Sequence, residues 1–230
     1  MYIYKFFCME KLILSLFVSN LLFLMSCGQN PPAGKEQSPM ANGDVIVGGR
    51  CEGCEAIYES TVKFDQLSST ATLPDFDEPG EKLEISGIVY KANGTTPATD
   101  IILYVYHTDQ NGLYSSKTGE GWEKRHGYVR GWLKTDAAGR YKILTLRPAP
   151  YPGGEAPAHI HPVIKEEGKS AYWIDEFVFD DDPNINSSYR AGMQSRGGSG
   201  ILHLVKDGEK YKATRNIILG ANIPAYPTDQ

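Results

Sequence analysis

A chain of 230 residues, 41% of them hydrophobic, is long enough to bury the core of one sizeable domain. The formal net charge of -5 leaves no basic excess, which argues against a nucleic-acid-binding protein. The composition therefore predicts a globular domain that has no nucleic-acid partner.

The first 27 residues are predicted to be a bacterial lipoprotein signal peptide rather than part of the fold. Residues 12–25 are almost entirely apolar, a run that is short for a membrane span but suits a signal peptide. The run ends in Leu24-Met-Ser-Cys27, which is similar to a lipobox, so Cys27 is expected to carry the lipid. We expect the mature protein to be lipid-anchored in the bacterial cell envelope, at the outer membrane. An uncleaved membrane anchor is the alternative.

Two segments are expected to precede the main domain. Residues 28–44 are rich in proline, glycine and polar residues and predict a flexible tether. Residues 45–82 have little periodicity and predict a lead-in segment, with one helical turn near residues 56–59. Cys51 and Cys54 lie in this segment, and in an oxidising compartment they could form a small disulfide-bridged loop or bind a metal.

Residues 83–230 show short apolar runs separated by turn sequences and no long stretch with a 3.6-residue period. Asp207-Gly208, for example, separates residues 201–205 from residues 211–219 and predicts a hairpin. Strands at this spacing predict an all-β fold, an antiparallel β-sandwich whose long loops form a metal site.

Two histidines one residue apart, His159 and His161, are the first candidate metal ligands. In a strand, residues i and i+2 point to the same face, so both imidazoles can reach one point. Tyr151 precedes them across a loop rich in proline and glycine, and Tyr114 lies in a separate turn. Phenolate is a hard anionic ligand that favours a small, highly charged ion, so this set predicts Fe(III) rather than zinc or copper.

From about residue 83 to residue 225, the chain resembles the intradiol ring-cleavage dioxygenases. The similar pieces stand in the order found in that family. They are Ile85–Tyr90, Ile101–His107, the Tyr114 turn, Tyr128–Tyr141, Arg147–Tyr151, His159-Ile-His161 and Asp181-Asp-Pro183.

This resemblance implies that Tyr114, Tyr151, His159 and His161 are the four ligands of an Fe(III) ion. It also implies a small aromatic substrate, a catechol, whose ring is opened by O2 between the two hydroxyl-bearing carbons. Tyr151 would have a catalytic role as well, because it gives way to the catechol and takes up one of its protons. The lead-in is too short for the helical dimerisation region of some relatives, so a homo-oligomer is left open.

Two positions depart from the family pattern. Relatives usually carry an arginine three residues before the first ligand histidine, and here that residue is Ala156. Where relatives often carry a glutamine that faces the substrate, this chain has Asp175 and Glu176. Ala156 and Glu176 are therefore the candidate substrate-binding positions, and the loss of a cation should weaken stabilisation of an anionic intermediate. Three arginines could replace the missing cation: Arg125, Arg130 and Arg147.

Two other functions fit parts of the sequence. A non-catalytic, transthyretin-like β-sandwich lipoprotein that binds a ligand or partner would explain the strand-and-turn pattern of residues 85–94 and 135–141. A zinc hydrolase could use His159, His161 and a carboxylate from Asp175 or Glu176. Neither alternative explains why the two tyrosines accompany the histidine pair.

Overall fold

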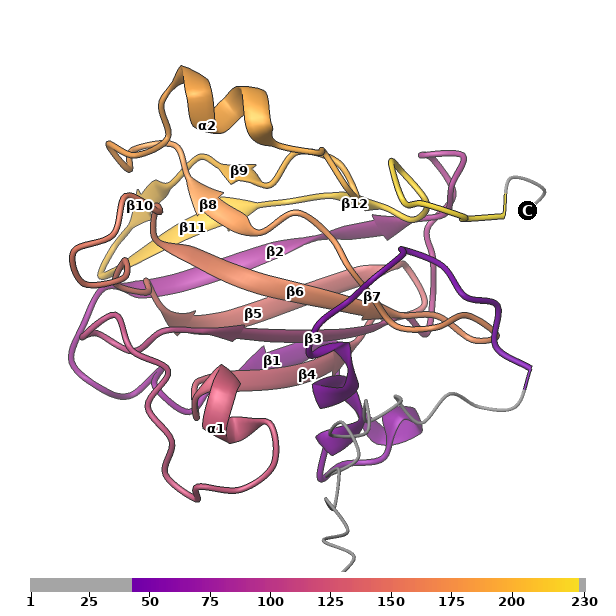
Figure 1. Ribbon diagram of the computed structural model, residues 1–230, viewed down its shortest axis with the longest axis horizontal. Coiled ribbons are helices and arrows are strands. Elements are labelled where there is room, and N and C mark those ends of the chain that lie inside the picture. The colour runs from indigo at the N-terminus through magenta and orange to yellow at the C-terminus, as the bar shows by residue number, and fades with distance from the viewer. Residues whose placement is uncertain (1–42, 228–230) are drawn as a thin grey trace, which may run out of the picture. The chain divides into compact units, whose positions relative to one another are not determined.

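Two β-sheets make up most of the computed structural model, which describes residues 43–227 (Figure 1). The predicted signal peptide with Cys27, and most of the predicted tether, lie outside the described residues. Within residues 43–227, no helix is both long and apolar enough to cross a membrane.

Each sheet contains six strands. The first has the order β1 (Thr70–Thr72), β5 (Arg140–Leu146), β2 (Lys82–Tyr90), β11 (Lys210–Thr214) and β10 (Val205–Asp207), with β12 (Ile217–Ile218) also paired to β2. The second has the order β4 (Arg130–Lys134), β3 (Ile102–His107), β6 (His159–Lys165), β8 (Phe177–Phe179) and β9 (Ile201–Leu202), with β7 (Tyr172–Trp173) also paired to β6. The predicted all-β sandwich is confirmed.

The pairing of the strands is not antiparallel throughout. Four pairs are parallel: β1 with β5, β11 with β2, β12 with β2, and β8 with β9. A tight turn forces only consecutive strands to run antiparallel, whereas strands that return through long connections can pair in either direction. The hairpin predicted at Asp207-Gly208 forms between β10 and β11, but residues 201–202 join the other sheet as β9.

The burial pattern of the strands explains where the main core forms. In β2 and β5, alternate residues such as Leu83, Ile85 and Ile143 are fully buried, as expected for strands with one face on the core. Strand β3 is buried on both faces. Leu103 and Val105 pack in the same core cluster as these β2 and β5 side chains, whereas Ile102 and Tyr104 pack in a second cluster.

Residues 45–82 pack in the same compact unit as the rest of the described chain. The 3₁₀ helix η1 (Cys54–Glu59) packs Ala56 and Ile57 against Ile102 and Tyr104 of β3. A second 3₁₀ helix, η2 (Phe64–Gln66), follows, and β1 adds an edge strand to the first sheet. The two α-helices are short: α1 (Glu123–His126) and α2 (Ser187–Gly192).

The cysteine pair of this segment is joined. Cys51 and Cys54 form a disulfide that closes a short loop at the start of η1. Of the two predicted alternatives, a disulfide or a metal site, the structure shows the disulfide. Because η1 covers the outer face of the second sheet, the disulfide loop is held close to β3 and β6.

Candidate metal centre and adjoining cavity

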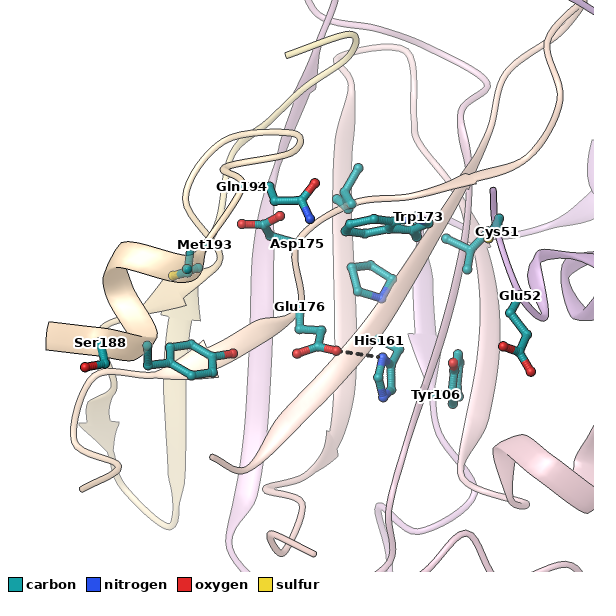
Figure 2. A pocket seen from close by; sticks show the side chains of 15 residues that line it. Cys51, Glu52, Tyr106, His161, Trp173, Asp175, Glu176, Ser188, Met193 and Gln194 are labelled. Carbon is teal, nitrogen blue, oxygen red and sulfur yellow. Dashed lines mark ion pairs between the residues drawn. The ribbon is translucent and has the colours of Figure 1, made fainter. Parts of the chain in front are cut away.

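A cavity of about 610 Å³ opens beside the second sheet (Figure 2). Its walls come from β6, from the connection between β7 and β8, from α2, and from the disulfide loop. A smaller cavity of about 260 Å³ is lined by Tyr114, Tyr151 and His161. The two cavities share Glu52, Tyr106 and His161, so they adjoin at the His161 side chain.

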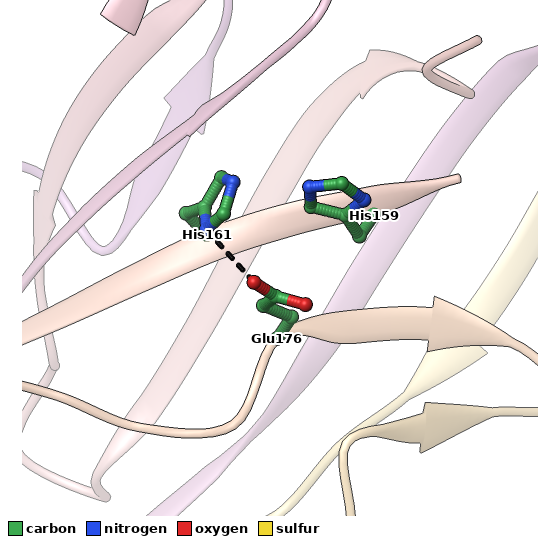
Figure 3. Close-up of side chains that lie close together, drawn as sticks. All are labelled: His159, His161 and Glu176. Atoms are coloured by element: carbon green, nitrogen blue, oxygen red, sulfur yellow. Dashed lines mark ion pairs between the residues drawn. The ribbon is translucent and has the colours of Figure 1, made fainter. Parts of the chain in front are cut away.

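His159 and His161 lie at the start of β6 and reach toward the same region, as the i and i+2 spacing predicts (Figure 3). His159 Nδ1 donates a hydrogen bond to the Pro157 carbonyl oxygen at 2.7 Å. His161 Nδ1 lies 3.2 Å from Glu176 Oε1. A carbonyl or carboxylate oxygen only accepts, so in neutral rings the proton sits on Nδ1 and leaves each Nε2 with a free lone pair.

The two predicted tyrosines lie at these Nε2 atoms. Tyr114 Oη is 2.8 Å from His161 Nε2 and 2.7 Å from Tyr151 Oη, and Tyr151 Oη is 3.1 Å from His159 Nε2. When both imidazoles are neutral, only the two phenolic protons are available for these three contacts. In one of the contacts, two lone pairs therefore face each other with no hydrogen atom between them. A bound cation would satisfy all four atoms at once.

Burial favours the neutral forms of both phenols and of the His159 imidazole when no cation is bound. Burial raises the pKa of the Tyr114 hydroxyl well above its usual range, and its hydrogen bond with Tyr151 raises it further. Burial also raises the pKa of Tyr151 and lowers the pKa of His159. A metal ion that binds through both phenols must therefore displace their protons, which favours a highly charged ion.

Turn chemistry positions Tyr114 in the loop that follows β3. The Asp109 carboxylate accepts hydrogen bonds from the backbone N–H groups of Asn111 and Leu113 and from the Ser115 hydroxyl. These bonds lower the pKa of the Asp109 carboxyl despite its partial burial, which by itself would raise it. An aspartate that closes its own turn in this way explains why the Asp109–Gly112 sequence folds as a tight loop.

The far end of the same loop is held by Glu123 of α1. Its Oε1 accepts hydrogen bonds from the Ser116 hydroxyl at 2.9 Å and from the backbone N–H groups of Lys117 and Thr118, both at 2.6 Å. The hydrogen bond from Thr118, followed by those from Ser116 and Lys117, lowers the pKa of the Glu123 carboxyl to about 2. Tyr114 is therefore bracketed by two ionised carboxylates that close the loop.

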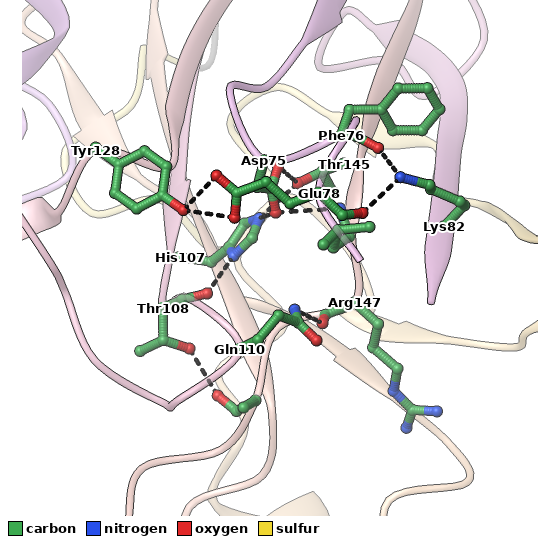
Figure 4. Close-up of polar contacts among 12 residues, drawn as sticks. Asp75, Phe76, Glu78, Lys82, His107, Thr108, Gln110, Tyr128, Thr145 and Arg147 are labelled. Atoms are coloured by element: carbon green, nitrogen blue, oxygen red, sulfur yellow. Dashed lines mark hydrogen bonds and ion pairs between the residues drawn. The ribbon is translucent and has the colours of Figure 1, made fainter. Parts of the chain in front are cut away.

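The Tyr114 loop is tied to the Tyr151 loop (Figure 4). Thr108 Oγ1 donates to the Ala149 carbonyl oxygen at 2.6 Å, and Gln110 Nε2 donates to the Arg147 carbonyl oxygen at 2.8 Å. Glycine at position 112 allows the two loops to come into contact, because a Cβ atom at this position would lie 2.1 Å from the Pro150 carbonyl oxygen. This close approach brings the two phenols within hydrogen-bonding distance.

A buried polar network fixes the end of β3 from which the Tyr114 loop departs. The His107 side chain is fully buried, with Nδ1 2.7 Å from the Thr108 carbonyl oxygen and Nε2 2.7 Å from Thr145 Oγ1 (Figure 4). The contact with Thr145 links β3 to β5, and Thr145 Oγ1 in turn donates to Asp75 Oδ1 at 2.8 Å. Both ring nitrogens of His107 are occupied by these contacts, so this histidine has a structural role and not a ligand role.

An aromatic stack supports His161 from the neighbouring strand. Tyr106 pairs with His161 in the β3–β6 register, and their ring centroids are 4.6 Å apart. His126 stacks on the other face of Tyr106 at 3.8 Å with nearly parallel planes. Burial, and then the charge of His161, lowers the pKa of His126 to about 3. The alternation of Tyr104 and Tyr106 in a predicted strand was the one sequence signal for this stack.

The two departures from the family pattern lie in different places. Ala156 is half-buried and does not line either cavity. Glu176 lines the larger cavity, because the pairing of Phe177 with Ile160 places it opposite His161. Burial raises the pKa of the Glu176 carboxyl, but its hydrogen bond with His161 and the charges of the two histidines outweigh this and lower the pKa overall.

Of the two carboxylates considered for a zinc site, one is close to the histidines. Ligand atoms of His159, His161 and Glu176 all lie within 4.8 Å of one another. Asp175 instead accepts hydrogen bonds from the backbone N–H groups of Ser195 and Arg196. Several other residues that line the larger cavity were not predicted from the sequence, among them Glu52, Trp173, Tyr189, Met193 and Gln194.

Comparison with known proteins places this site in a family. A family model described as Dioxygenase matches residues 57–196, well over half of the 230-residue chain. The chain belongs to this dioxygenase family. The resemblance to intradiol ring-cleavage dioxygenases that was predicted from the sequence is thereby confirmed. The match includes both tyrosines and both histidines of the candidate metal centre.

Solved structures similar to this dioxygenase-family protein share its fold. The dioxygenase domain of a dioxygenase carbohydrate-binding protein fusion from Streptomyces sp. SirexAA-E is 22% identical with a TM-score of 0.50, over 62% of this chain and 82% of that one. Catechol 1,2-dioxygenase from Pseudomonas arvilla C-1 is 20% identical with a TM-score of 0.51, and the enzyme from Acinetobacter sp. ADP1 is 19% identical with a TM-score of 0.50. Each of these two alignments covers 66% of this chain but only 56% of the catechol dioxygenase.

Proposed function

We propose that this protein is a non-haem Fe(III) dioxygenase that opens a catechol-type ring between its two hydroxyl-bearing carbons with O2. The observation that supports the proposal is the convergence of Tyr114 Oη, Tyr151 Oη, His159 Nε2 and His161 Nε2 in contacts of 2.7–3.1 Å. Two phenols and two imidazoles do not have enough protons to hydrogen-bond to one another at every contact. They are better satisfied as ligands of a trivalent cation. These four residues would hold the iron.

Iron held in this way would draw electron density from a bound catechol and so make its ring reactive toward O2. The residues of the chain supply the rest. Tyr151 Oη is the phenol on the proline- and glycine-rich loop, where the next residues, 152–155, are exposed, so it is the group with room to move aside and take a proton from a catechol hydroxyl. Tyr114, held between Asp109 and Glu123, stays in place. The Tyr106 ring keeps the His161 imidazole oriented by stacking on it.

The first test is metal content and product. Protein that begins after the signal peptide and is loaded aerobically with iron should hold about one iron per chain and should be red-brown, because tyrosinate-to-Fe(III) charge transfer absorbs visible light. With catechol and O2 it should form a ring-opened diacid that mass spectrometry can identify. A colourless protein that holds one zinc through His159, His161 and Glu176 would favour the hydrolase. A protein that holds no metal would favour the ligand-binding sandwich.

We further propose that the protein is anchored in the cell envelope by a lipid on Cys27. The Leu24-Met-Ser-Cys27 sequence and the polar residues that follow it support this proposal. In the bacterial host, Cys27→Ser should move the protein from the membrane fraction to the soluble fraction without changing its thermal stability, because Cys27 ends the predicted signal peptide and comes before the residues that form the two sheets. Cys51→Ser is the control for loss of a cysteine, and it should stay in the membrane fraction. An equally membrane-bound Cys27→Ser protein would show that the apolar segment itself is the anchor.

A further inference from the structure

The larger cavity is acidic. Among the residues that line it, three carry carboxylates, Glu52, Asp175 and Glu176, and none is a lysine or an arginine. Figure 2 shows Glu176 beside His161 in the middle of this cavity, with Asp175 on one side and Glu52 on the other. A cavity of one charge sign selects ligands of the opposite sign, because water is partly excluded from it and charges interact more strongly there.

Two of these carboxylates already have partners. Glu52 forms an exposed ion pair with Arg125. Asp175 is buried, accepts two backbone hydrogen bonds, and lies beside the guanidinium group of Arg215, which donates to the Asp175 carbonyl oxygen at 2.6 Å. The cavity therefore gains little net charge from Glu52 and Asp175.

Glu176 differs from both. Its contacts are the Nδ1 of His161 at 3.2 Å and the hydroxyl of Tyr189. Neither group carries a formal charge once His161 binds a metal through Nε2. The half-buried carboxylate of Glu176 is then a net negative charge in the larger cavity beside His161, and burying such a charge is costly unless a cation pairs with it.

The arginines that could have supplied a cation are engaged elsewhere. Arg130 pairs with Glu59 at 2.7 Å, and Arg147 forms a bidentate pair with Asp181 at 2.7 and 2.9 Å. Arg125 lines only the smaller cavity, where Glu52 is its partner. Because no lysine or arginine lines the larger cavity, a cation that pairs with Glu176 inside it would come from the ligand.

We propose that the aromatic substrate carries a positively charged group, an ammonium on a short flexible arm, which pairs with Glu176 in the larger cavity. This inference rests on the proposed catechol chemistry and adds the substrate class to it. A neutral catechol that passes a proton to Tyr151 adds no net charge to the centre, so the negative charge of Glu176 stays unbalanced until a cation on the same molecule pairs with it. The cavity volume of about 610 Å³ falls in the range that holds ligands larger than a single ring, so it has room for such an arm.

The test compares three catechols that share one ring and a two-carbon arm but differ in charge: dopamine (cation), 4-ethylcatechol (neutral) and 3,4-dihydroxyphenylacetate (anion). Binding to the iron-loaded protein is followed by the shift of its visible spectrum and by calorimetry without O2. Dopamine should bind at least about 10-fold more tightly than the anion, with 4-ethylcatechol between them. Added salt should weaken dopamine binding and strengthen binding of the anion, because screening reduces both the attraction and the repulsion.

Glu176→Gln should remove most of this ranking, since it keeps the shape of the side chain and deletes its charge. The matched control is Glu167→Gln, an exposed glutamate in the turn after β6, which should keep the ranking. If Glu176→Gln fails to hold iron, the ranking and salt response of the unmodified protein decide the question. Equal affinities, or tighter binding of the anion, would overturn the inference while leaving the catechol chemistry in place. If none of the three binds, the proposed function itself is wrong.

Discussion

His161→Ala should abolish the red-brown colour of the iron-loaded protein and weaken iron binding by at least about 100-fold. Loss of a group that only supports a metal ligand weakens metal binding by up to about 100-fold, so loss of a ligand itself should cost at least as much. His161 connects the candidate centre to the larger cavity and to β3. Its Nε2 lies 2.8 Å from Tyr114 Oη, its Nδ1 contacts Glu176, and its ring stacks on Tyr106. Without it the remaining ligands form a more hydrated site, and Glu176 loses its neighbour.

The control for this experiment is His203→Ala. His203 is exposed and pairs with Asp180 at the surface, so the substitution removes one imidazole without touching the centre. Iron content, measured by elemental analysis after dialysis against a weak chelator, should be unchanged in His203→Ala. If His161→Ala keeps both its iron and its colour, the four-ligand centre is wrong.

Gly112→Ala should weaken iron binding more than any other substitution considered except His161→Ala, although Gly112 is not a ligand. Its backbone has φ +75°, and a Cβ atom would meet the Pro150 carbonyl oxygen at 2.1 Å, far inside van der Waals contact. The Tyr114 and Tyr151 loops would have to separate, and the 2.7 Å contact between their phenols would be lost. We expect iron binding to weaken by more than about 10-fold, which corresponds to 1.4 kcal/mol or more of lost binding free energy.

Gly119→Ala separates this effect from backbone strain. Gly119 lies in the same loop with φ +67°, but a Cβ atom there would have nothing within 4 Å. Both substitutions force alanine into the left-handed region, at a cost of roughly 1–2 kcal/mol. Both should therefore lower the melting temperature, while only Gly112→Ala should lose iron and shift the visible absorption. Equal iron affinity in the two variants would show that the loops can part without disturbing the phenols.

The amino-acid sequence alone determined the composition of the candidate centre. The i and i+2 spacing of His159 and His161 in a strand requires both side chains to point to one face, whatever the rest of the fold does. The chemistry of phenol and imidazole then favours ferric iron before any distance is known. The short strands and turn sequences likewise predicted the β-sandwich, because turn residues and strand length are local properties of the chain.

The approach of the two tyrosines was decided by tertiary structure. Nothing in the sequence near Tyr114 shows that Gly112 meets Pro150, because that contact joins residues far apart in the chain. The parallel strand pairs, and the cover that η1 provides over β3, also depend on long connections whose direction the local sequence does not specify.

The charge of the larger cavity was decided in the same way. Glu176 was visible as a departure from a family pattern, and three arginines were candidates to compensate for Ala156. Only the pairing of Arg130 with Glu59, of Arg147 with Asp181 and of Arg125 with Glu52 shows where those cations are used. Electrostatic interactions act through space, so the partner of a charged side chain depends on the folded structure and not on its position in the sequence.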